Sequence, residues 1–391
     1  MIWNRSSPVR QHRSWRERLH GFFWGSGLRK VLSVVVLSRF FIFVVGIFSI
    51  VFLPKFAKYQ EFSHSLPVDM WIRHDALKYL AIADKGYSFY NPGQPSSAGW
   101  FPLYPSLIRA GQYVLDPAIA GIITSHVALI VAMLLLYRLL RLDLSRQLSY
   151  RTILYMLVFP ASIFFSSIHS ESLFLALSVG SFYAARRGGW GIAGTLGFLA
   201  SLTRAAGILL LPALFIEYCV QKGFIKGWTI DLRKLHTFDC SVGWLALIPA
   251  GTMLFGLFLY RTFGNVFAYI DVQVDVNRTV SLLATLLRGE PLHSAALLGV
   301  PYLLFAVALL YFMRTTLRQS YVVYTLLSLM LPLYTSFTLA MYRYMIVVFP
   351  LFMMLAIVAA RARTHRYVTV GSIILLVIYM VGFVNGATFV F

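Results

Sequence analysis

The sequence predicts an all-α protein built as a polytopic bundle of about eleven transmembrane helices. Of its 391 residues, 59% are hydrophobic and only 12% are charged, and the mean hydropathy is +0.74. So little polar surface cannot cover a water-soluble protein of this size. Apolar runs long enough to cross a bilayer recur along the chain, and short basic clusters separate them.

The first thirty residues, 1–30, are predicted to form a basic arm on the cytoplasmic side. They contain seven Lys and Arg residues against one acidic residue, Glu17, which favours the cytosol and anionic lipid headgroups. The apolar run 31–53 continues into Pro54 without the small-residue cleavage site of a signal peptide. We therefore predict that this run is the first span, which leads outward from a cytoplasmic N-terminus.

Further spans follow along the chain, each of about 20 apolar residues or somewhat fewer. The stretch 189–220 is divided into two short helices that turn at 202–204. A single helix there would move the basic loop 222–234 to the outer side. The predicted spans are 118–137, 151–168, 171–185, 189–203, 206–220, 242–262, 294–313, 320–339, 344–360 and 367–389.

The distribution of basic residues supports this topology. Of the 34 Lys and Arg residues, 22 lie in segments assigned to the inside and 11 in segments assigned to the outside, as the positive-inside rule requires. The C-terminus then lies outside. The net charge of +20 is thus typical of cytoplasmic loops and not of nucleic-acid binding. Cys219 and Cys240 flank a predicted cytoplasmic loop and offer no disulfide framework.

The remaining polar residues are predicted to gather on the external side. Residues 31–391 are expected to form one transmembrane domain whose longest outer loops are 54–117 and 263–293. Ionisable residues at the ends of spans usually face a protein interior or an aqueous cavity, so we predict one external site. Its candidate parts are the Asp75 segment, the turn 169–171, Arg204 and Arg343.

The first outer loop contains the segment on which we expect the site to be built. Asp69, Asp75 and Asp84 lie in it, three of only 14 acidic residues in the chain. Helical patterning predicts a short interfacial helix over 69–84, and Gly86 is expected to end it. We predict that Asp75 is the chemical centre, and that Asp69 and Asp84 have structural roles.

Several blocks of sequence, spread over nearly the whole chain, are similar to one known family. They comprise Trp71-x-x-x-Asp75-Ala-x-x-Tyr79-x-x-Ile82-Ala-x-x-Gly86-Tyr87, then Phe101-Pro-Leu-Tyr-Pro105, and residues 159–165, 170–174, 202–207, 263–273, 343–344 and 349–352. In the same order, these blocks resemble the PIG-V family, the second mannosyltransferases of GPI-anchor synthesis and their prokaryotic relatives. His74 departs from the aromatic residue expected before the aspartate.

The resemblance implies a GT-C glycosyltransferase, here an inverting mannosyltransferase. The implied donor is mannose on a polyprenyl (dolichyl-type) phosphate, used on the non-cytosolic face of a bacterial plasma membrane or an endoplasmic reticulum membrane. The implied acceptor is a lipid-linked or envelope glycan. The expected partners are therefore this donor, a glycolipid or glycan acceptor and membrane lipid.

Asp75 is predicted to be the general base of the transfer. Transfer from a lipid phosphate needs a base for the acceptor hydroxyl and cations for the leaving phosphate. The alternative role of Asp75 is a helix cap or a salt bridge with Arg73 or Lys78. His74 either assists proton transfer or forms a hydrogen bond within the loop.

Arg204 and Arg343 are predicted to bind the donor phosphate. A guanidinium group is permanently charged and contacts two phosphate oxygens at once; interfacial anchoring is the alternative. Glu171 either caps the helix that it begins or binds sugar hydroxyls. Arg39, inside the first span, is expected to snorkel or to pair internally.

Aromatic residues make up 16% of the chain, and most are expected to be interfacial anchors. Tyr79, Trp100 and Tyr104 lie in the blocks described above and are predicted to contribute to the substrate site, with Trp100 and Tyr104 stacking on a sugar ring. No metal site and no cofactor are predicted. No His, Asp or Glu cluster has the spacing of metal ligands, and no glycine-rich loop suits a nucleotide sugar.

A transporter or lipid flippase is the alternative function, because such proteins are also polytopic and contain buried charges. Transporters often show paired internal repeats and helices broken near the middle of the membrane. This chain shows no detectable repeat, and its unusual polar residues are predicted to lie at one face. The sequence therefore favours the enzyme.

Overall fold

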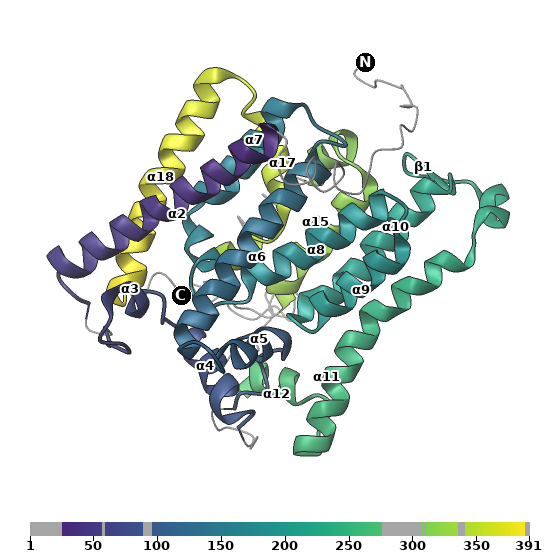
Figure 1. Ribbon diagram of the computed structural model, residues 1–391. Coiled ribbons are helices and arrows are strands. Elements are labelled where there is room, and N and C mark those ends of the chain that lie inside the picture. The colour runs from purple at the N-terminus through teal and green to yellow at the C-terminus, as the bar shows by residue number, and fades with distance from the viewer. Residues whose placement is uncertain are drawn as a thin grey trace, which may run out of the picture.

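The computed structural model describes residues 26–56, 59–88, 96–275, 307, 310–334 and 341–387. This part of the chain is mainly helical (Figure 1). Four of its helical stretches are long and apolar enough to cross a bilayer: Gly27–Phe52, Pro117–Leu140, Cys240–Phe263 and Ala362–Asn385. The protein is therefore an integral membrane protein, as its composition predicts.

The described elements are helices and one small sheet. One two-stranded antiparallel sheet, β1 and β2, pairs Ile225 with Ile230 and Lys226 with Thr229. The bounds are α2 Ser26–Phe52, α3 Leu66–Asp69, α4 Ala76–Lys85, α5 Leu103–Gly111, α6 Pro117–Leu140, α7 Arg146–Val158, η1 Pro160–Phe165, α8 Glu171–Arg186, α9 Trp190–Ser201, η2 Ala205–Leu209, α10 Leu210–Gln221, β1 Ile225–Lys226, β2 Thr229–Ile230, η3 Leu232–Thr237, η4 Cys240–Ala246, α11 Leu247–Phe263, α12 Ala268–Asp275, α15 Gln319–Tyr334, α16 Met341–Met345, α17 Phe349–Val358 and α18 Ala362–Asn385.

The division of the stretch 189–220 into two helices is confirmed. Helix α9 ends at Ser201, and η2 begins at Ala205 after a turn over 202–204. Most of the predicted span 294–313 and much of the loop 263–293 lie outside the described residues, as does the arm up to residue 25. The number of spans therefore stays a prediction.

The predicted span 151–168 is interrupted in the structure. Phe159, the last residue before Pro160, is extended, with φ −61° and ψ 141°, because the proline ring disfavours a helical conformation in the residue before it. Helix α7 therefore ends at Val158, and the chain continues as the 3₁₀ segment η1.

Arg39 of α2 stabilises this interruption. It is almost completely buried, and it donates hydrogen bonds of 2.7 Å to the carbonyl oxygens of Leu157 and Ser162. These carbonyl groups lie at the helix break, where backbone groups need partners from outside the helix. Internal pairing of Arg39 is thus confirmed.

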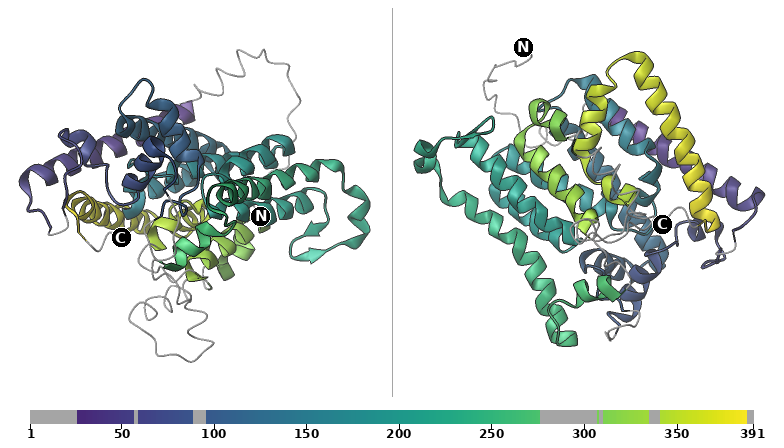
Figure 2. Two further views of the ribbon diagram at one scale, coloured as in Figure 1. Left: turned by 90° about the horizontal axis from the view of Figure 1, so that it is seen from below. Right: turned by 180° about the vertical axis from the view of Figure 1, so that it is seen from behind.

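The helices pack into one continuous bundle. Helix α6 packs against α8, α8 against α9 and α9 against α11, while α2 and α18 lie side by side on the opposite flank (Figure 2). Helices α4 and α5 lie together at the lower end in Figure 1, and α3 lies to their left beside the end of α2. A small apolar core that includes Tyr79, Tyr104 and Ile168 joins them to α6.

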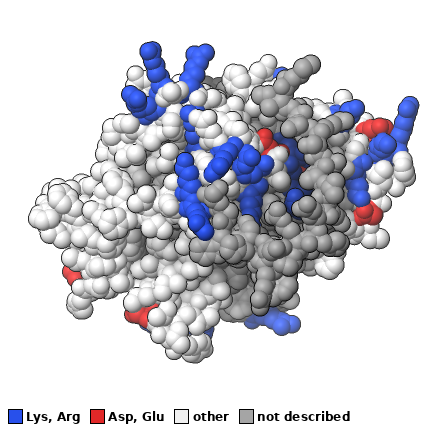
Figure 3. Space-filling model, turned by 45° about the horizontal axis from the view of Figure 1, so that its top comes forward, with Lys and Arg blue, Asp and Glu red and all other residues white. Residues whose placement is uncertain are grey.

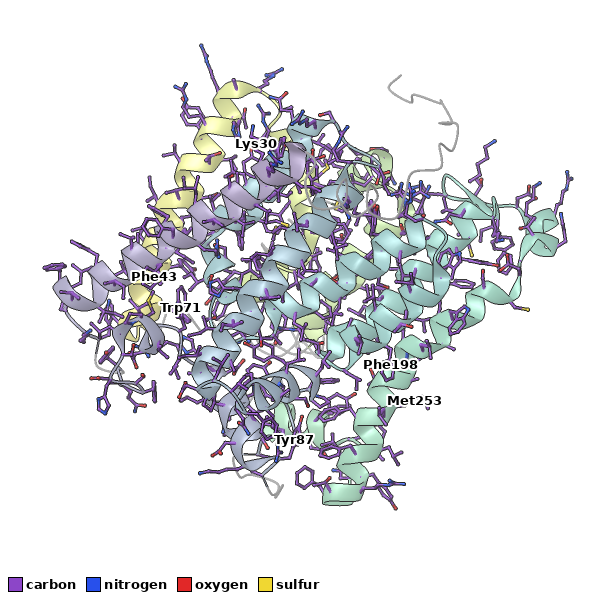
Figure 4. All side chains as sticks on the ribbon, viewed as in Figure 1. Lys30, Phe43, Trp71, Tyr87, Phe198 and Met253 are labelled. Carbon is purple, nitrogen blue, oxygen red and sulfur yellow. The ribbon has the colours of Figure 1, made fainter. Side chains whose placement is uncertain are left out.

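Basic side chains gather at the upper end of the bundle. In the view that brings the upper end of the molecule forward, Lys and Arg side chains outnumber acidic ones on the described surface (Figure 3). Lys30 lies toward this basic end, whereas Tyr87 lies at the other end with α4 (Figure 4).

A buried ion-pair network joins α8, α10 and α15. Glu217 is fully buried, and it pairs with Arg318 at 2.9 Å and with Arg186 at 3.4 Å. Ser320 donates to the same carboxylate at 2.8 Å, and Arg186 also pairs with Asp143. Each charge in this network has an opposite charge beside it, so we assign it a structural role.

Candidate functional site

The segment that carries Asp75 is broken where the sequence predicts one helix over 69–84. Helix α3 ends at Asp69, and α4 begins at Ala76. Between them His74 adopts a left-handed backbone conformation, with φ 56°, which no α-helix accommodates. Non-glycine residues with such a φ are uncommon and often lie at functional sites. The prediction that Gly86 ends α4 is confirmed, with φ 80°.

Asp69 and Arg73 hold the first part of this segment. Asp69 is completely buried and accepts hydrogen bonds from the backbone N–H groups of Phe62 at 2.7 Å and Ser63 at 3.1 Å. Its other oxygen pairs with Arg73 at 2.7 Å. Arg73 also donates to the carbonyl oxygen of Val384 in α18, at 3.1 Å. The structural role predicted for Asp69 is therefore confirmed.

Asp75 lies at the N-cap position of α4, but its side chain makes no capping hydrogen bond. The carboxylate instead accepts from Arg343 of α16, with Oδ2 at 2.6 Å from Nη1. The capping alternative for Asp75 is therefore wrong. A partner 268 residues away in the chain orients this carboxylate.

Four charged residues form a chain of contacts that we call the Asp75–Arg204 cluster. Arg343 bonds Asp75 through Nη1 and Glu171 through Nε, and Arg204 bonds the same Glu171 oxygen through Nη1 at 2.7 Å. The order of contact is Asp75, Arg343, Glu171, Arg204. Two positive charges thus face two negative charges, and one carboxylate bridges both guanidinium groups.

Glu171 is the first residue of α8, yet it does not cap that helix as the sequence suggests. Its side chain is fully buried, and its Oε1 atom accepts hydrogen bonds from both Arg204 and Arg343. Its other oxygen, Oε2, has no hydrogen-bond partner among the described residues. A buried carboxylate oxygen without a partner is energetically unfavourable, so this atom has capacity for a further donor.

The two arginines also have donors that the cluster does not use. Three of their nitrogen atoms make no hydrogen bond to any residue that the structure describes: Nη2 of Arg343, and Nε and Nη2 of Arg204. Arg204 lies over the ring of Tyr344 at 5.6 Å and Arg343 over that of Phe164 at 4.9 Å. Aromatic faces thus fix both guanidinium groups, and further N–H groups of both remain for an anion.

Tyr79 and Tyr104 lie beside the cluster. The Tyr79 hydroxyl is 3.0 Å from the hydroxyl of Ser170, which also accepts from Arg204 at 3.4 Å. The ring of Tyr104 packs edge-on against Tyr79, and its hydroxyl is 2.7 Å from that of Ser125. Both tyrosine rings are buried. The structure therefore gives Tyr104 a packing position and leaves it no free face for a sugar.

Trp100 is half-buried and packs on the apolar core that contains Tyr79 and Tyr104. Its ring is 5.6 Å from the ammonium group of Lys78, and its carbonyl oxygen accepts from the hydroxyl of Tyr87 at 2.7 Å. No contact recorded for the described residues joins Trp100 to the four charged residues. Its role in binding a sugar stays a prediction.

His74 packs edge-on against Phe383 of α18 at 5.4 Å. Burial, with a smaller contribution from the nearby charge of Arg343, lowers the pKa of His74 to about 4, although the carboxylate of Asp75 acts in the opposite direction. The imidazole is therefore neutral near neutral pH. It is not a cation that could assist the departure of a phosphate.

Two further residues belong to the site, and the sequence analysis gave neither of them a role of its own. Ser170 joins Tyr79 to Arg204. The Nδ1 atom of His169 is 2.8 Å from the Ser167 hydroxyl, and its Nε2 is buried without a partner in the described chain. The predicted position of 169–171 at an outer turn was the feature of the sequence that could have indicated both residues. In the described ranges, no group of three His, Cys, Asp or Glu residues is arranged to hold a metal ion.

Comparison with known proteins identifies the family. A sequence profile described as "Mannosyltransferase (PIG-V)" matches residues 71–265, a range that contains Asp75, Glu171 and Arg204. The chain belongs to the PIG-V mannosyltransferase family. This confirms the resemblance found in the sequence blocks. Arg343 lies outside the matched range, and the structure shows its contacts with Asp75 and Glu171.

A curated relative supports the same family. GPI alpha-1,6-mannosyltransferase 2 of Mus musculus is 28% identical over 211 residues, which cover 49% of this chain and 40% of that protein. The match thus spans less than half of that relative.

Solved structures with a similar course of the chain are archaeal oligosaccharyltransferases of Archaeoglobus fulgidus. One, tethered to an acceptor peptide, has a TM-score of 0.47 and 12% identity and covers 94% of this chain and 56% of that one. Another, AglB in complex with an inhibitory peptide and a dolichol-phosphate, has a TM-score of 0.45 and 14% identity, with coverage of 97% and 56%.

Proposed function

We propose that this PIG-V family protein is an inverting membrane mannosyltransferase of the GT-C type. In this proposal it transfers mannose from a polyprenyl (dolichyl-type) phosphate to a lipid-linked or envelope glycan. The observation that carries the proposal is the Asp75–Arg204 cluster, because it places a carboxylate and two arginines with unused donors in one buried chain of contacts. These are the groups that transfer from a lipid phosphate requires.

Asp75 is the general base in this mechanism. It removes the proton from an acceptor hydroxyl as the hydroxyl oxygen forms a bond to C1 of mannose. The bond between C1 and the phosphate oxygen breaks, and the polyprenyl phosphate leaves with the electron pair. Attack from the face opposite the leaving group inverts the configuration at C1.

Arg204 and Arg343 stabilise the departing phosphate. The donor phosphodiester carries one negative charge, and the product phosphate carries more, so the contact strengthens as the bond breaks. Donor binding also affects Asp75. When Arg343 bonds the phosphate, its hold on the Asp75 carboxylate weakens, and the carboxylate becomes a stronger base.

Glu171 positions both arginines. Without a counter-charge, two guanidinium groups that share one phosphate site repel each other. A carboxylate between them keeps them in place before the donor arrives. We assign Glu171 this positioning role in place of the predicted contact with sugar hydroxyls.

The cluster is proposed to face the non-cytosolic side of the membrane. It involves α4, α8 and α16, and α4 lies at the end opposite to Lys30 and the basic surface (Figures 3 and 4). A basic surface favours the cytosol. We therefore place the N-terminus in the cytosol and the site outside the cytosol or in the lumen.

A transfer assay tests the proposed function. The purified protein is incubated in liposomes with radiolabelled polyprenyl phosphate mannose and an extract of lipid-linked glycans from the source cells. We expect label in the glycan fraction only when both substrates are present. Label that crosses the bilayer while still on the polyprenyl phosphate would support a transporter or flippase and contradict the enzyme.

A further inference from the structure

An open groove with a volume of about 470 Å³ lies between α2 and α6, within the range of about 300–1,000 Å³ that is usual for ligand pockets. Phe40 and Phe43 of α2 face Ile122 and Ile123 of α6 across it. The lining is thus mainly apolar, with polar atoms only from a few side chains.

The walls of the groove show what fills it. Both α2 and α6 are long and apolar enough to span the membrane, so the groove lies at the depth of the hydrocarbon. Val36 in its wall is 59% exposed and Ile123 is 45% exposed, so the groove opens sideways to lipid. Its occupant is therefore a hydrocarbon chain and not water.

Arg39 lies part-way along the groove, one turn of α2 outward from Val35. Its guanidinium donates to the carbonyl oxygens of Leu157 and Ser162, at 2.7 Å each, and to nearby hydroxyl groups. These bonds occupy its donors, so Arg39 is not available for a lipid phosphate. The middle of the groove therefore offers no free guanidinium donor to a lipid headgroup, and we place a headgroup at the outer end, beside the Asp75 segment.

The outer end of the groove leads to the Asp75 segment. Pro67 and Trp71 line it, and Trp71 is four residues before Asp75. The N–H group of Ile168 donates to the carbonyl oxygen of Trp71 at 3.4 Å, which joins this end to the turn that precedes Glu171. Figure 4 shows Phe43 and Trp71 close to each other on this side of the bundle.

The donor phosphate is assigned to the opposite side of Asp75. Arg204 begins the segment η2, which packs against α9, α11 and α15. These helices lie away from α2 in Figure 1. A chain that leaves the phosphate at Arg204 enters the bilayer near them, and the α2–α6 groove then remains for the second substrate.

We infer that the α2–α6 groove binds a hydrocarbon chain of a lipid-linked acceptor and brings its sugar hydroxyl to Asp75. This inference rests on the proposed function, and it adds that the acceptor is a glycolipid whose lipid part is recognised. Donor and acceptor chains then enter from opposite flanks, with the base between their headgroups.

Photolabelling of the protein in phosphatidylcholine nanodiscs tests this assignment without relying on catalysis. Three probes carry a diazirine in the hydrocarbon chain: a hexosyl diacylglycerol, a polyprenyl phosphate and phosphatidylcholine. We expect the hexosyl lipid to label α2 and α6 around Phe43 and Ile123. Stronger labelling there by polyprenyl phosphate, or equal labelling by phosphatidylcholine, would overturn the inference.

A bulky side chain that fills the groove gives a second test, and a matched control variant lies on the same helix. Ile123→Trp should reduce labelling by the hexosyl lipid and raise KM for a glycolipid acceptor roughly tenfold, the effect of losing the burial of about two methylene groups. KM for the donor should not change. Ile119 is similarly exposed, at 37%, but lies outside the groove, so Ile119→Trp should change neither value.

Equal effects of the two tryptophan variants would contradict the inference. The wild-type labelling map decides the matter if Ile123→Trp does not fold. Failure of the proposed function is distinguishable, because it removes transfer while leaving the labelling map intact.

Discussion

Replacement of Glu171 by glutamine tests the bridge between the two arginines. Glu171→Gln keeps the side-chain volume and one acceptor oxygen but removes the charge that faces Arg343 and Arg204. Glu171 is fully buried, and the two arginine side chains are only 13% and 15% exposed, so solvent screens little of the loss. Removing one partner of a buried ion pair costs about 3–5 kcal/mol. We expect a loss of about 3 kcal/mol in the free energy of unfolding, since one hydrogen bond can remain.

Glu217 provides a matched control at the other end of the bundle. It is also fully buried and also faces two arginines, Arg186 and Arg318, but it lies outside the proposed site. Glu217→Gln should lower the free energy of unfolding by a similar amount. Turnover per folded molecule should stay near wild type in this variant, whereas Glu171→Gln should lower it about a hundredfold because the arginines lose their position.

Reversible unfolding in detergent, followed by tryptophan fluorescence, gives the stabilities, and a transfer assay corrected for folded protein gives turnover. If Glu171→Gln lowered the free energy of unfolding by less than about 1 kcal/mol, the contacts of Glu171 with the two arginines would not be a source of stability. Equal turnover in the two variants would refute its link to function.

Three further predictions concern the arginines, His74 and the topology. Arg204→Lys and Arg343→Lys should each fold but lower donor kcat/KM roughly tenfold to a hundredfold, because an ammonium group cannot make the bidentate contact; wild-type donor kinetics in both would remove them from the phosphate site. The pKa of His74 is lowered from 6.5 to about 4, chiefly by burial, so the unfolded chain binds a proton between these values and the folded protein does not. Stability should therefore fall as the pH drops from 6.5 to 4, and His74→Asn, which tolerates the left-handed backbone, should weaken this dependence; an unchanged pH profile of unfolding would contradict the burial argument. In a variant without the two native cysteines, a cysteine at Asp84 should react with an impermeant thiol reagent in intact cells, and one at Thr229 should not; labelling at Thr229 without permeabilisation would reverse the topology.

The sequence predicts the apolar helices and the break at 202–204 because both follow from local composition and the position of basic residues. It also indicates Asp75, Glu171, Arg204 and Arg343 as unusual charges at the ends of spans. These predictions need no knowledge of side-chain contacts, since the cost of placing a charge in lipid restricts its position by itself.

The partners of these charges could not be predicted. Asp75 and Arg343 are 268 residues apart, and only the packed bundle brings them together. The helical periodicity of 69–84 is real, but Arg73 bonds Val384 of α18 and His74 takes a left-handed conformation, so tertiary contacts override the local preference. For the same reason Glu171 bridges two arginines where the sequence suggests a cap.

The most direct test of the central claim is the transfer rate of folded Asp75→Asn. Asparagine keeps the size of the side chain and can accept a hydrogen bond from Arg343, but it cannot take a proton from an acceptor hydroxyl at neutral pH. We expect folded protein with donor binding near wild type and no measurable transfer, while Asp75→Glu retains weak transfer, since a shift of about 1 Å lowers rates on the order of a hundredfold. Transfer by folded Asp75→Asn at more than a small fraction of the wild-type rate would show that Asp75 is not the base.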